Sequence, residues 1–218
     1  MSETFATRTL ADIATALPGA TAVFRRSKLD FCCGGGVKLA EAAAARGLSV
    51  AALEQELDAI AERALPATLP ATTDALIDLI ETRYHAAHRH ELPELVELAR
   101  RVEAVHAAHP AVPRGIAALL QGLADELEAH MQKEEQILFP MMRRGGHPMI
   151  RKPIAVMLAE HDAAGEHLHQ LEALTGDFTV PADACPTWRA LYVGARKFAD
   201  DLMEHIHTEN NVLFPRFA

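Results

Sequence analysis

Two short segments of the chain carry the same pattern of potential metal ligands. Each contains a histidine, a glutamate four residues later and a Phe-Pro pair, first in residues 130–140 and again in residues 205–215. The copies begin 75 residues apart, at His130 and His205. Residues four apart lie on the same face of an α-helix, so each copy presents one imidazole and one carboxylate together. The repeated segments therefore predict two pairs of metal ligands.

A second pair of histidines, His85 and His161, lies 76 residues apart. The two repeats supply four ligands and this pair supplies two more. Six nitrogen and oxygen ligands are enough for two metal ions and too many for one tetrahedral zinc. Because a carboxylate has two oxygens, the repeated glutamates are the natural bridges, and each ion would receive two histidines. Iron, manganese or zinc suit these ligand types. The predicted metal ligands are His85, His130, Glu134, His161, His205 and Glu209.

Two further glutamates lie close to these ligands in the sequence. Glu126 precedes His130 by one helical turn on the same face, and Glu160 is adjacent to His161. Either carboxylate could support a ligand or line an access path, and a solvated side chain is the alternative for each. We include both among the candidate catalytic residues.

Adjacent cysteines at positions 32 and 33 precede three glycines. A disulfide between neighbouring residues is strained, so Cys32 and Cys33 are predicted to be free thiols. An acidic thiol here could bind iron, accept a nitrosyl group or exchange disulfides, which makes both residues candidates for the catalytic chemistry. The alternative is one buried cysteine and one bystander.

The remaining cysteine and several other histidines fit no pattern. Cys185, just before Pro186, is expected to be a passive loop thiol. We expect the following histidines to be exposed or at an interface: His88, His106, His167, His169 and His207.

The elements that position these residues are predicted to be helices, because alanine is abundant and aromatic residues make up only 5% of the chain. A proline- and threonine-rich linker separates a small helical domain, residues 1–65, from a second domain, residues 73–218. Ser49 is the predicted N-cap of one helix, and Gly47 ends the helix before it. The predicted helices cover residues 10–17, 20–26, 37–46 and 50–64 in the first domain, and 73–108 (kinked at Pro93), 113–138, 150–174 and 186–213 in the second.

The second domain is predicted to be an up-down four-helix bundle. In two antiparallel helical hairpins, counting residues from each turn puts the paired ligands at similar heights, as a metal site in a bundle core requires. The fold class is therefore all-α.

Composition excludes several kinds of partner. The net charge is −9, and no Lys/Arg cluster extends beyond short pairs, so neither nucleic acid nor an anionic membrane is an expected partner. The chain has no apolar run near the ~20 residues of a membrane helix and no signal peptide pattern at its start. Its 3 cysteines do not form a disulfide framework. We expect a cytoplasmic, reduced protein.

The motifs resemble a known family. Residues 130–140, 160–166 and 205–216 resemble the hemerythrin-like di-iron bundle. Residues 18–24 and the Asp-Phe-Cys-Cys-Gly-Gly segment at 30–35 resemble the small domain that precedes this bundle in iron-sulfur cluster repair proteins. The chain is identified as a member of the Repair of Iron Centers family.

This resemblance implies two non-haem iron ions in a carboxylate-bridged centre, and a role in restoring iron-sulfur clusters after nitrosative or oxidative damage. The implied partners are damaged iron-sulfur proteins, with nitric oxide or oxygen as a small-molecule ligand. A homodimer formed through the N-terminal domain is left open.

One departure separates the chain from oxygen-carrying hemerythrins, which have a further histidine one turn from the third-helix ligand. The positions four residues from His161 are Met157 and Gly165, so a dedicated oxygen carrier is disfavoured. Three functions follow for comparison. The first is cluster repair by iron donation, the second is a di-iron nitric oxide reductase, and the third is a module that senses oxygen or nitric oxide. No effector domain is visible in the sequence, which counts against the sensing function.

Overall fold

The computed structural model describes residues 4–62 and 69–217. Within these ranges every named element is a helix, and one isolated bridge joins Thr9 to Lys38. The predicted all-α class is confirmed. The first part of the predicted linker falls within residues 63–68, which lie outside the described ranges.

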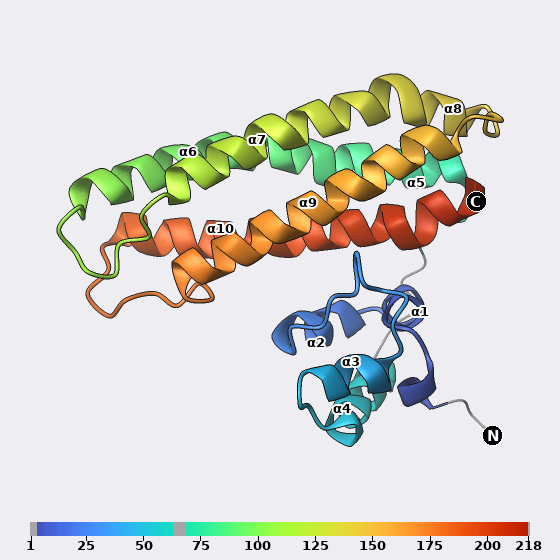
Figure 1. Cartoon of the computed structure of the whole chain (residues 1–218), viewed down its shortest axis with the longest axis horizontal. Helices are drawn as coiled ribbons and strands as arrows, with labels where there is room; N and C mark the ends of the chain where they lie inside the picture. Colours follow the sequence, from blue (N-terminus) through green and yellow to red (C-terminus); the bar gives the residue numbers. More distant parts are fainter. Residues whose placement is uncertain (1–3, 63–68, 218) are drawn as a thin grey trace. The chain divides into compact units, whose positions relative to one another are not determined.

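Short helices make up the N-terminal region, shown in blue in Figure 1. The Ser49 hydroxyl accepts a hydrogen bond from the Ala52 amide at 3.3 Å, and Gly47 has a positive φ of 66°, so both predicted helix ends are confirmed. Fully buried Phe24 and Phe31 lie in the core of this region. The elements are η1 (Phe5–Thr7), α1 (Leu10–Ala16), α2 (Ala20–Arg26), α3 (Leu39–Ala45) and α4 (Val50–Ala61).

The long helices that follow pack as a hemerythrin-like bundle, with successive long helices running in opposite directions (Figure 1). Their buried faces are largely aliphatic and aromatic, with Trp188, Phe139 and Phe198 among the largest fully buried side chains. The predicted bundle is confirmed. Its elements are α5 (Thr73–Leu79), α6 (Ala86–Val105), α7 (Ile116–Lys133), α8 (Phe139–Arg143), α9 (Arg151–Thr175) and α10 (Pro186–Thr208).

Three π-helical segments interrupt the expected α-helices: η2 (Ile80–His85), η3 (Glu134–Leu138) and η4 (Glu209–Leu213). The last two precede the repeated Phe-Pro pairs. Since Pro140 and Pro215 have no amide hydrogen, neither can bond to the carbonyl four residues earlier, and a widened turn accommodates that loss. Such segments are frequent at functional sites, and each of the three contains a predicted metal ligand.

The irregularity in the first long helix is not at the predicted position. Pro93 lies inside α6 without ending it, and the departure from α-helical geometry comes earlier, at η2. A short final 3-10 helix, η5 (Phe214–Phe217), follows η4.

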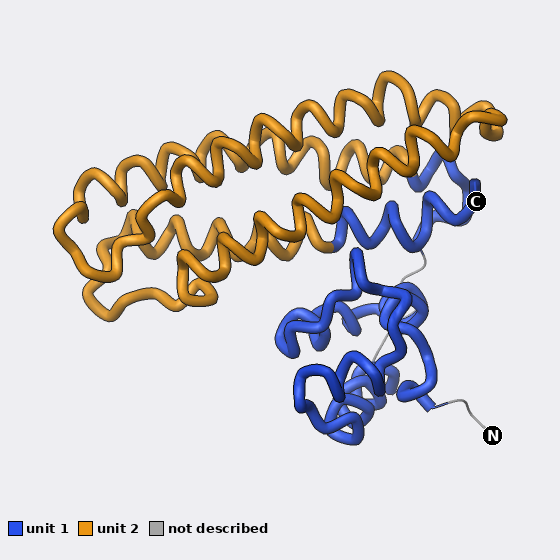
Figure 2. Tube along the Cα trace, viewed as in Figure 1, with its two compact units in different colours: residues 1–76, 204–218 blue, residues 77–203 orange. Residues whose placement is uncertain are grey.

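The chain divides into two compact units, coloured separately in Figure 2: residues 1–76 with 204–218, and residues 77–203. The boundary between Met203 and Glu204 falls inside α10, which is one continuous helix. The division into domains at residues 1–65 and 73–218 stays a prediction.

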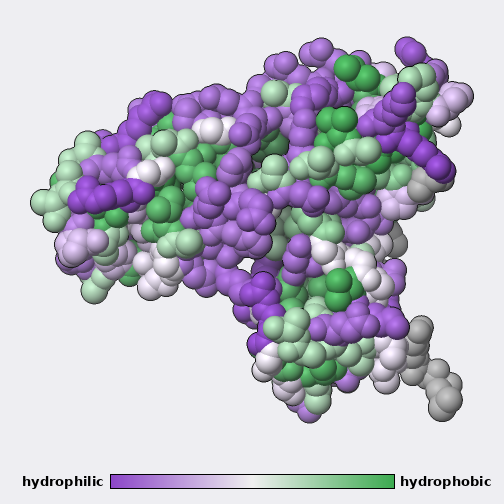
Figure 3. Space-filling view, viewed as in Figure 1, coloured by the Kyte–Doolittle hydropathy of each residue, from purple (hydrophilic) through white to green (hydrophobic). Residues whose placement is uncertain are grey.

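The surface in Figure 3 is largely hydrophilic over the long helices, with apolar side chains interspersed. A net charge of −9 agrees with that surface. Among the described residues, no helix combines the length and the apolar character needed to cross a membrane.

Candidate metal centre

Glu134 lies among the predicted ligands of the larger unit. Its side chain is fully buried at the start of η3, and Oε2 lies 3.4 Å from Nε2 of His85 and 3.4 Å from Nε2 of His130. His161 of α9 approaches the same place, because its Nε2 lies 3.1 Å from Nε2 of His130. Two α-helices, α7 and α9, and two π-helical segments, η2 and η3, therefore direct polar atoms to one point in an apolar core.

His205 and Glu209 form the corresponding pair at the end of α10 and the start of η4. Nε2 of His205 lies 3.1 Å from Oε1 of Glu209, and the side chains are 1% and 0% exposed. The spacing of four residues puts them on one helical face, as in the first copy of the motif.

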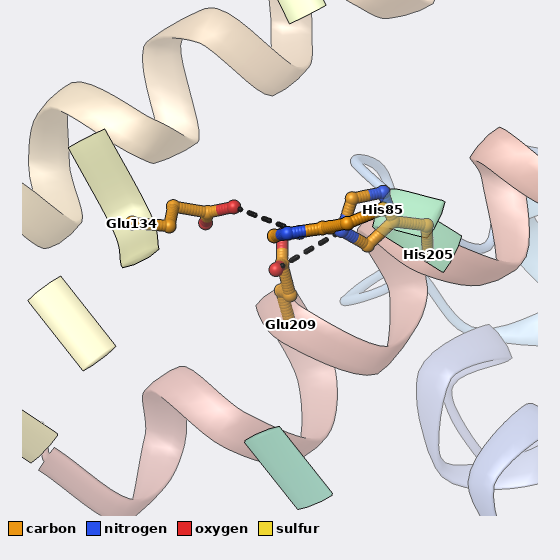
Figure 4. Close-up of side chains that lie close together, drawn as sticks. All are labelled: His85, Glu134, His205 and Glu209. Atoms are coloured by element: carbon orange, nitrogen blue, oxygen red, sulfur yellow. Dashed lines mark hydrogen bonds and ion pairs between the residues drawn. The ribbon is translucent and has the colours of Figure 1, made fainter. Parts of the chain in front are cut away.

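The potential ligand atoms fall into two groups, in each of which all atoms lie within 4.8 Å of one another. Both glutamates, Glu134 and Glu209, belong to both groups. The first group also contains His85 and His205, whose side chains converge with the two carboxylates in Figure 4. The second also contains His130 and His161. Two shared carboxylates with two histidines on either side suit a pair of metal ions.

Carboxylates outside these groups set the orientation of two imidazoles. Nδ1 of His85 lies 2.8 Å from Oε1 of Glu135, and Nδ1 of His130 lies 2.9 Å from Oε2 of Glu160. An ionised carboxylate only accepts hydrogen bonds, so Nδ1 is the donor in both histidines. A neutral imidazole then has its lone pair on Nε2, which is the atom directed at Glu134.

Both orienting carboxylates stay ionised. Burial alone would raise the pKa of Glu135, but hydrogen bonds from Arg89 and His85 outweigh it and lower that pKa. Burial opposes ionisation of Glu160 as well, and hydrogen bonds from Lys133 and His130 lower its pKa. Each acceptor is therefore held in the form that fixes the imidazole.

The donor set fits a bound cation. Neither carboxylate oxygen of Glu134 has a hydrogen-bond partner, although both are buried. A buried carboxylate without hydrogen bonds costs several kcal/mol. A divalent cation beside it would offset that cost, and neutral imidazole with ionised carboxylate is a suitable ligand set for iron, manganese or zinc.

The structure separates the two predicted supporting glutamates. Glu160 contacts His130 rather than its neighbour His161. Glu126 is 63% exposed, and its Oε2 lies 3.3 Å from Nδ1 of His167, so it is paired with that histidine rather than with a predicted ligand. Glu135, which contacts His85, was missed by the sequence reasoning.

Two of the histidines expected to be exposed or at an interface are buried in the structure. His88 is 1% exposed and packs edge-on against Phe198, with ring centroids 5.5 Å apart. His207 is 3% exposed and packs edge-on against Phe31 at the same distance. Aromatic contacts that close the core account for both, and burial lowers the pKa of His207.

The adjacent cysteines are free thiols with sulfur atoms 3.9 Å apart. Asp30 organises their loop, because its carboxylate accepts hydrogen bonds from the amides of Cys32, Cys33 and Gly34 at 2.9–3.1 Å. Cys32 is 6% exposed, and its hydrogen bond with Cys33, its burial and Asp30 together raise its pKa. Cys32 is therefore a buried thiol, whereas Cys33 is half-buried.

Residues next to Glu209 hold this loop. The Asn210 side-chain amide donates to the Cys32 carbonyl at 3.1 Å, and that of Asn211 donates to the Phe31 and Cys32 carbonyls at 3.2 Å. The backbone of the cysteine loop is thus bonded to the π-helical segment that begins with a candidate metal ligand.

The bundle and its paired histidine–glutamate groups define a cation-binding helical protein. A family described as "Hemerythrin HHE cation binding domain" matches residues 76–217. A second, described as "Domain of Unknown function (DUF542)", matches residues 6–61.

Similar proteins match over nearly the whole chain. A "Probable iron-sulfur cluster repair protein" of Haemophilus influenzae is 46% identical, with 97% of each chain covered. The "Iron-sulfur cluster repair protein YtfE" of Citrobacter koseri is 48% identical with the same coverage, and that of Yersinia pseudotuberculosis is 49% identical with 96% covered. The chain belongs to the YtfE family of iron-sulfur cluster repair proteins, as the resemblance in its motifs implied.

Proposed function

We propose that this chain binds two iron ions and donates iron to iron-sulfur proteins whose clusters have been damaged by nitrosative or oxidative stress. His85 and His205 would hold one ion, and His130 and His161 the other. Glu134 and Glu209 would bridge the two. Iron is the cargo of this reaction, and the damaged protein is its recipient.

The membership of both glutamates in both ligand groups is the observation that carries this proposal. A single ion would leave half of the histidines without a role. The names of the relatives supply the second support, since those proteins are called iron-sulfur cluster repair proteins.

Several features favour a site that can release its metal. The positions one turn on either side of His161 are Met157 and Gly165, which cannot supply another imidazole. Fewer strong ligands leave coordination positions for exchange or for a small molecule such as nitric oxide. Glu135 and Glu160 hold the histidines in the metal-binding tautomer while the metal leaves.

A repair assay tests the proposal. A cluster enzyme inactivated with nitric oxide is incubated with iron-loaded protein, and its recovered activity and the metal content of both partners are measured. We expect recovery with wild type and its loss with Glu134→Gln, which keeps the shape of the side chain but removes its charge. Equal recovery with both proteins would contradict a direct role of the centre.

The matched control is Glu126→Gln, which changes an exposed glutamate of α7 in the same way. This variant should restore the damaged enzyme as wild type does. Nitric oxide consumption in the same samples separates the alternative function. Many turnovers per chain would indicate a nitric oxide reductase, whereas recovery of the enzyme together with loss of iron from the chain supports donation.

A further inference from the structure

A cluster of nucleophilic and titratable side chains lies where α10 begins, far from the candidate metal centre. Cys185 directly precedes Pro186, and the sequence predicted that it is passive. His205 lies twenty residues further along α10, a distance of about 30 Å at the helical rise. Cys185 therefore takes no part in binding those metals.

Cys185 occupies the N-cap position of α10, a helix of 23 residues. Its carbonyl accepts the first helical hydrogen bond, from the Arg189 amide at 3.0 Å. The backbone amides of Trp188 and Thr187, in the first turn of the helix, lower the pKa of the Cys185 thiol. The amides at a helix N-terminus and the positive end of the helix dipole favour a thiolate over a thiol.

An imidazole from another helix completes the arrangement. His106 follows the last residue of α6, and its Nε2 lies 3.2 Å from Sγ of Cys185. The His106 ring is packed against the buried Trp188, with centroids 5.0 Å apart, which holds the nitrogen toward the sulfur. Amide hydrogen bonds and His106 lower the pKa of Cys185 to about 7.

Hydrogen bonds hold the loop that precedes α10 in place. Arg189 donates to the carbonyls of Ala184 and Ala182 at 3.0 and 2.9 Å. Asp183, the acidic residue of the loop that is nearer to Cys185 in the sequence, is paired with His109 at 3.0 Å. Cys185 itself is partly exposed, so a small molecule can reach a thiolate that its surroundings hold in place.

We propose that Cys185 and His106 form a reactive thiolate–imidazole pair that hydrogen peroxide oxidises to a sulfenic acid. The thiolate attacks one peroxide oxygen, a sulfur–oxygen bond forms and the oxygen–oxygen bond breaks. Sulfur loses two electrons, and the leaving hydroxide takes up the proton that His106 has accepted from the thiol and departs as water. A low-molecular-weight thiol then converts the sulfenic acid into a mixed disulfide and releases a second water.

The site would make the chain responsive to oxidants independently of its metal centre. The other cysteines of the sequence, Cys32 and Cys33, belong to the other compact unit. Reversal of the modification therefore falls to a small thiol or a reducing partner rather than to a neighbouring cysteine on α10.

Alkylation of the full-length, metal-loaded protein tests the pair. The rate of iodoacetamide modification is followed from pH 5 to 10 and resolved for each cysteine by peptide mass spectrometry. We expect the Cys185 rate to rise with a midpoint near pH 7. In His106→Ala the midpoint should move toward ~8.5, the value of an ordinary thiol, and the rate at pH 7 should fall several-fold.

The matched control is His90→Ala, which removes an exposed histidine from the same α6 and should leave the profile unchanged. Peroxide followed by a dimedone probe should label Cys185 in wild type and much less in His106→Ala. Cys185→Ser should lose the label and keep its full metal content. A wild-type midpoint above ~8 or equal labelling of wild type and His106→Ala would overturn the proposal.

Discussion

Oε2 of Glu160 lies 2.9 Å from Nδ1 of His130, and this contact determines which nitrogen of the imidazole faces Glu134. The carboxylate comes from α9 and the histidine from α7, so the contact also joins two helices of the bundle. Lys133 reaches the same carboxylate from the helix that carries His130. Glu160 thus positions a candidate ligand without belonging to either ligand group.

Removal of Glu160 should weaken metal binding without unfolding the chain. In Glu160→Ala the His130 ring loses the acceptor that fixes its tautomer, and loss of such a partner costs roughly 10–100-fold in metal affinity. Competition with a chelator measures that affinity, and helical content is checked by circular dichroism. The exposed Glu126→Ala serves as control. Unchanged affinity in Glu160→Ala would show that the contact does not position His130.

Metal removal should destabilise the protein, because the buried Glu134 carboxylate then lacks both a cation and a hydrogen bond. Binding at 100 times the dissociation constant contributes about 2.7 kcal/mol, so we expect the apo protein to melt roughly 5–10 °C lower. Glu134→Gln should behave differently when both proteins are free of metal. Without metal it should be at least as stable as wild type, since a buried charge has been removed.

Calorimetry on the metal-loaded and metal-free forms of both proteins checks this pair of expectations. Identical melting temperatures of apo and metal-loaded wild type would show that the buried carboxylates need no cation.

Helical geometry explains which of the metal ligands could be predicted from the sequence. His and Glu four residues apart must share a face, so the ligand pairs 130/134 and 205/209 could be recognised from spacing alone. His85 and His161 could be added because they repeat at nearly the same offset. The N-cap at Ser49 could also be predicted from the sequence, because a serine hydroxyl suits the start of a helix.

Other features depend on contacts between helices. Glu135 follows Glu134 directly, and neighbouring residues on a helix point in different directions, so spacing gave no reason to link it to His85. His88 and His207 are covered by Phe198 and Phe31, which come from distant parts of the sequence. The π-helical segments before Pro140 and Pro215 had a signal in the repeated Phe-Pro pairs, whereas η2 is followed by no such pair.

Acid should remove one specific contribution to stability. Burial alone would raise the pKa of Asp201, but hydrogen bonds from Arg83 at 2.7 Å and Lys197 at 2.8 Å lower it. A carboxylate with a lowered folded pKa stabilises the protein above its unfolded pKa of ~3.9, and that stabilisation is lost as the pH falls through the folded pKa.

Asp201→Asn should therefore be less stable than wild type at pH 7, by roughly 1–3 kcal/mol, and the difference should shrink toward pH 3. Urea unfolding of the metal-free proteins at several pH values measures it. Exposed Asp58→Asn is the control and should follow wild type throughout. A difference that stays constant with pH would contradict an ionic role for Asp201.

The cysteine loop provides a test of close packing. A Cβ on Gly35 would lie 2.5 Å from the Phe31 carbonyl oxygen and 2.9 Å from Cβ of Ala11, whereas one on Gly36 would meet nothing within 4 Å. Gly35→Ala should cost about 1–3 kcal/mol of unfolding free energy, and Gly36→Ala should change it by less than about 0.5 kcal/mol. Equal denaturation midpoints for the two variants would show that the loop is not packed as described.

The proposed function requires that the two ligand groups sharing Glu134 and Glu209 hold two iron ions. Elemental analysis of protein purified without added metal and without oxygen tests this most directly. We predict about two irons per chain in wild type and a clear loss in Glu134→Gln. One zinc per chain, or no bound metal, would contradict the proposal.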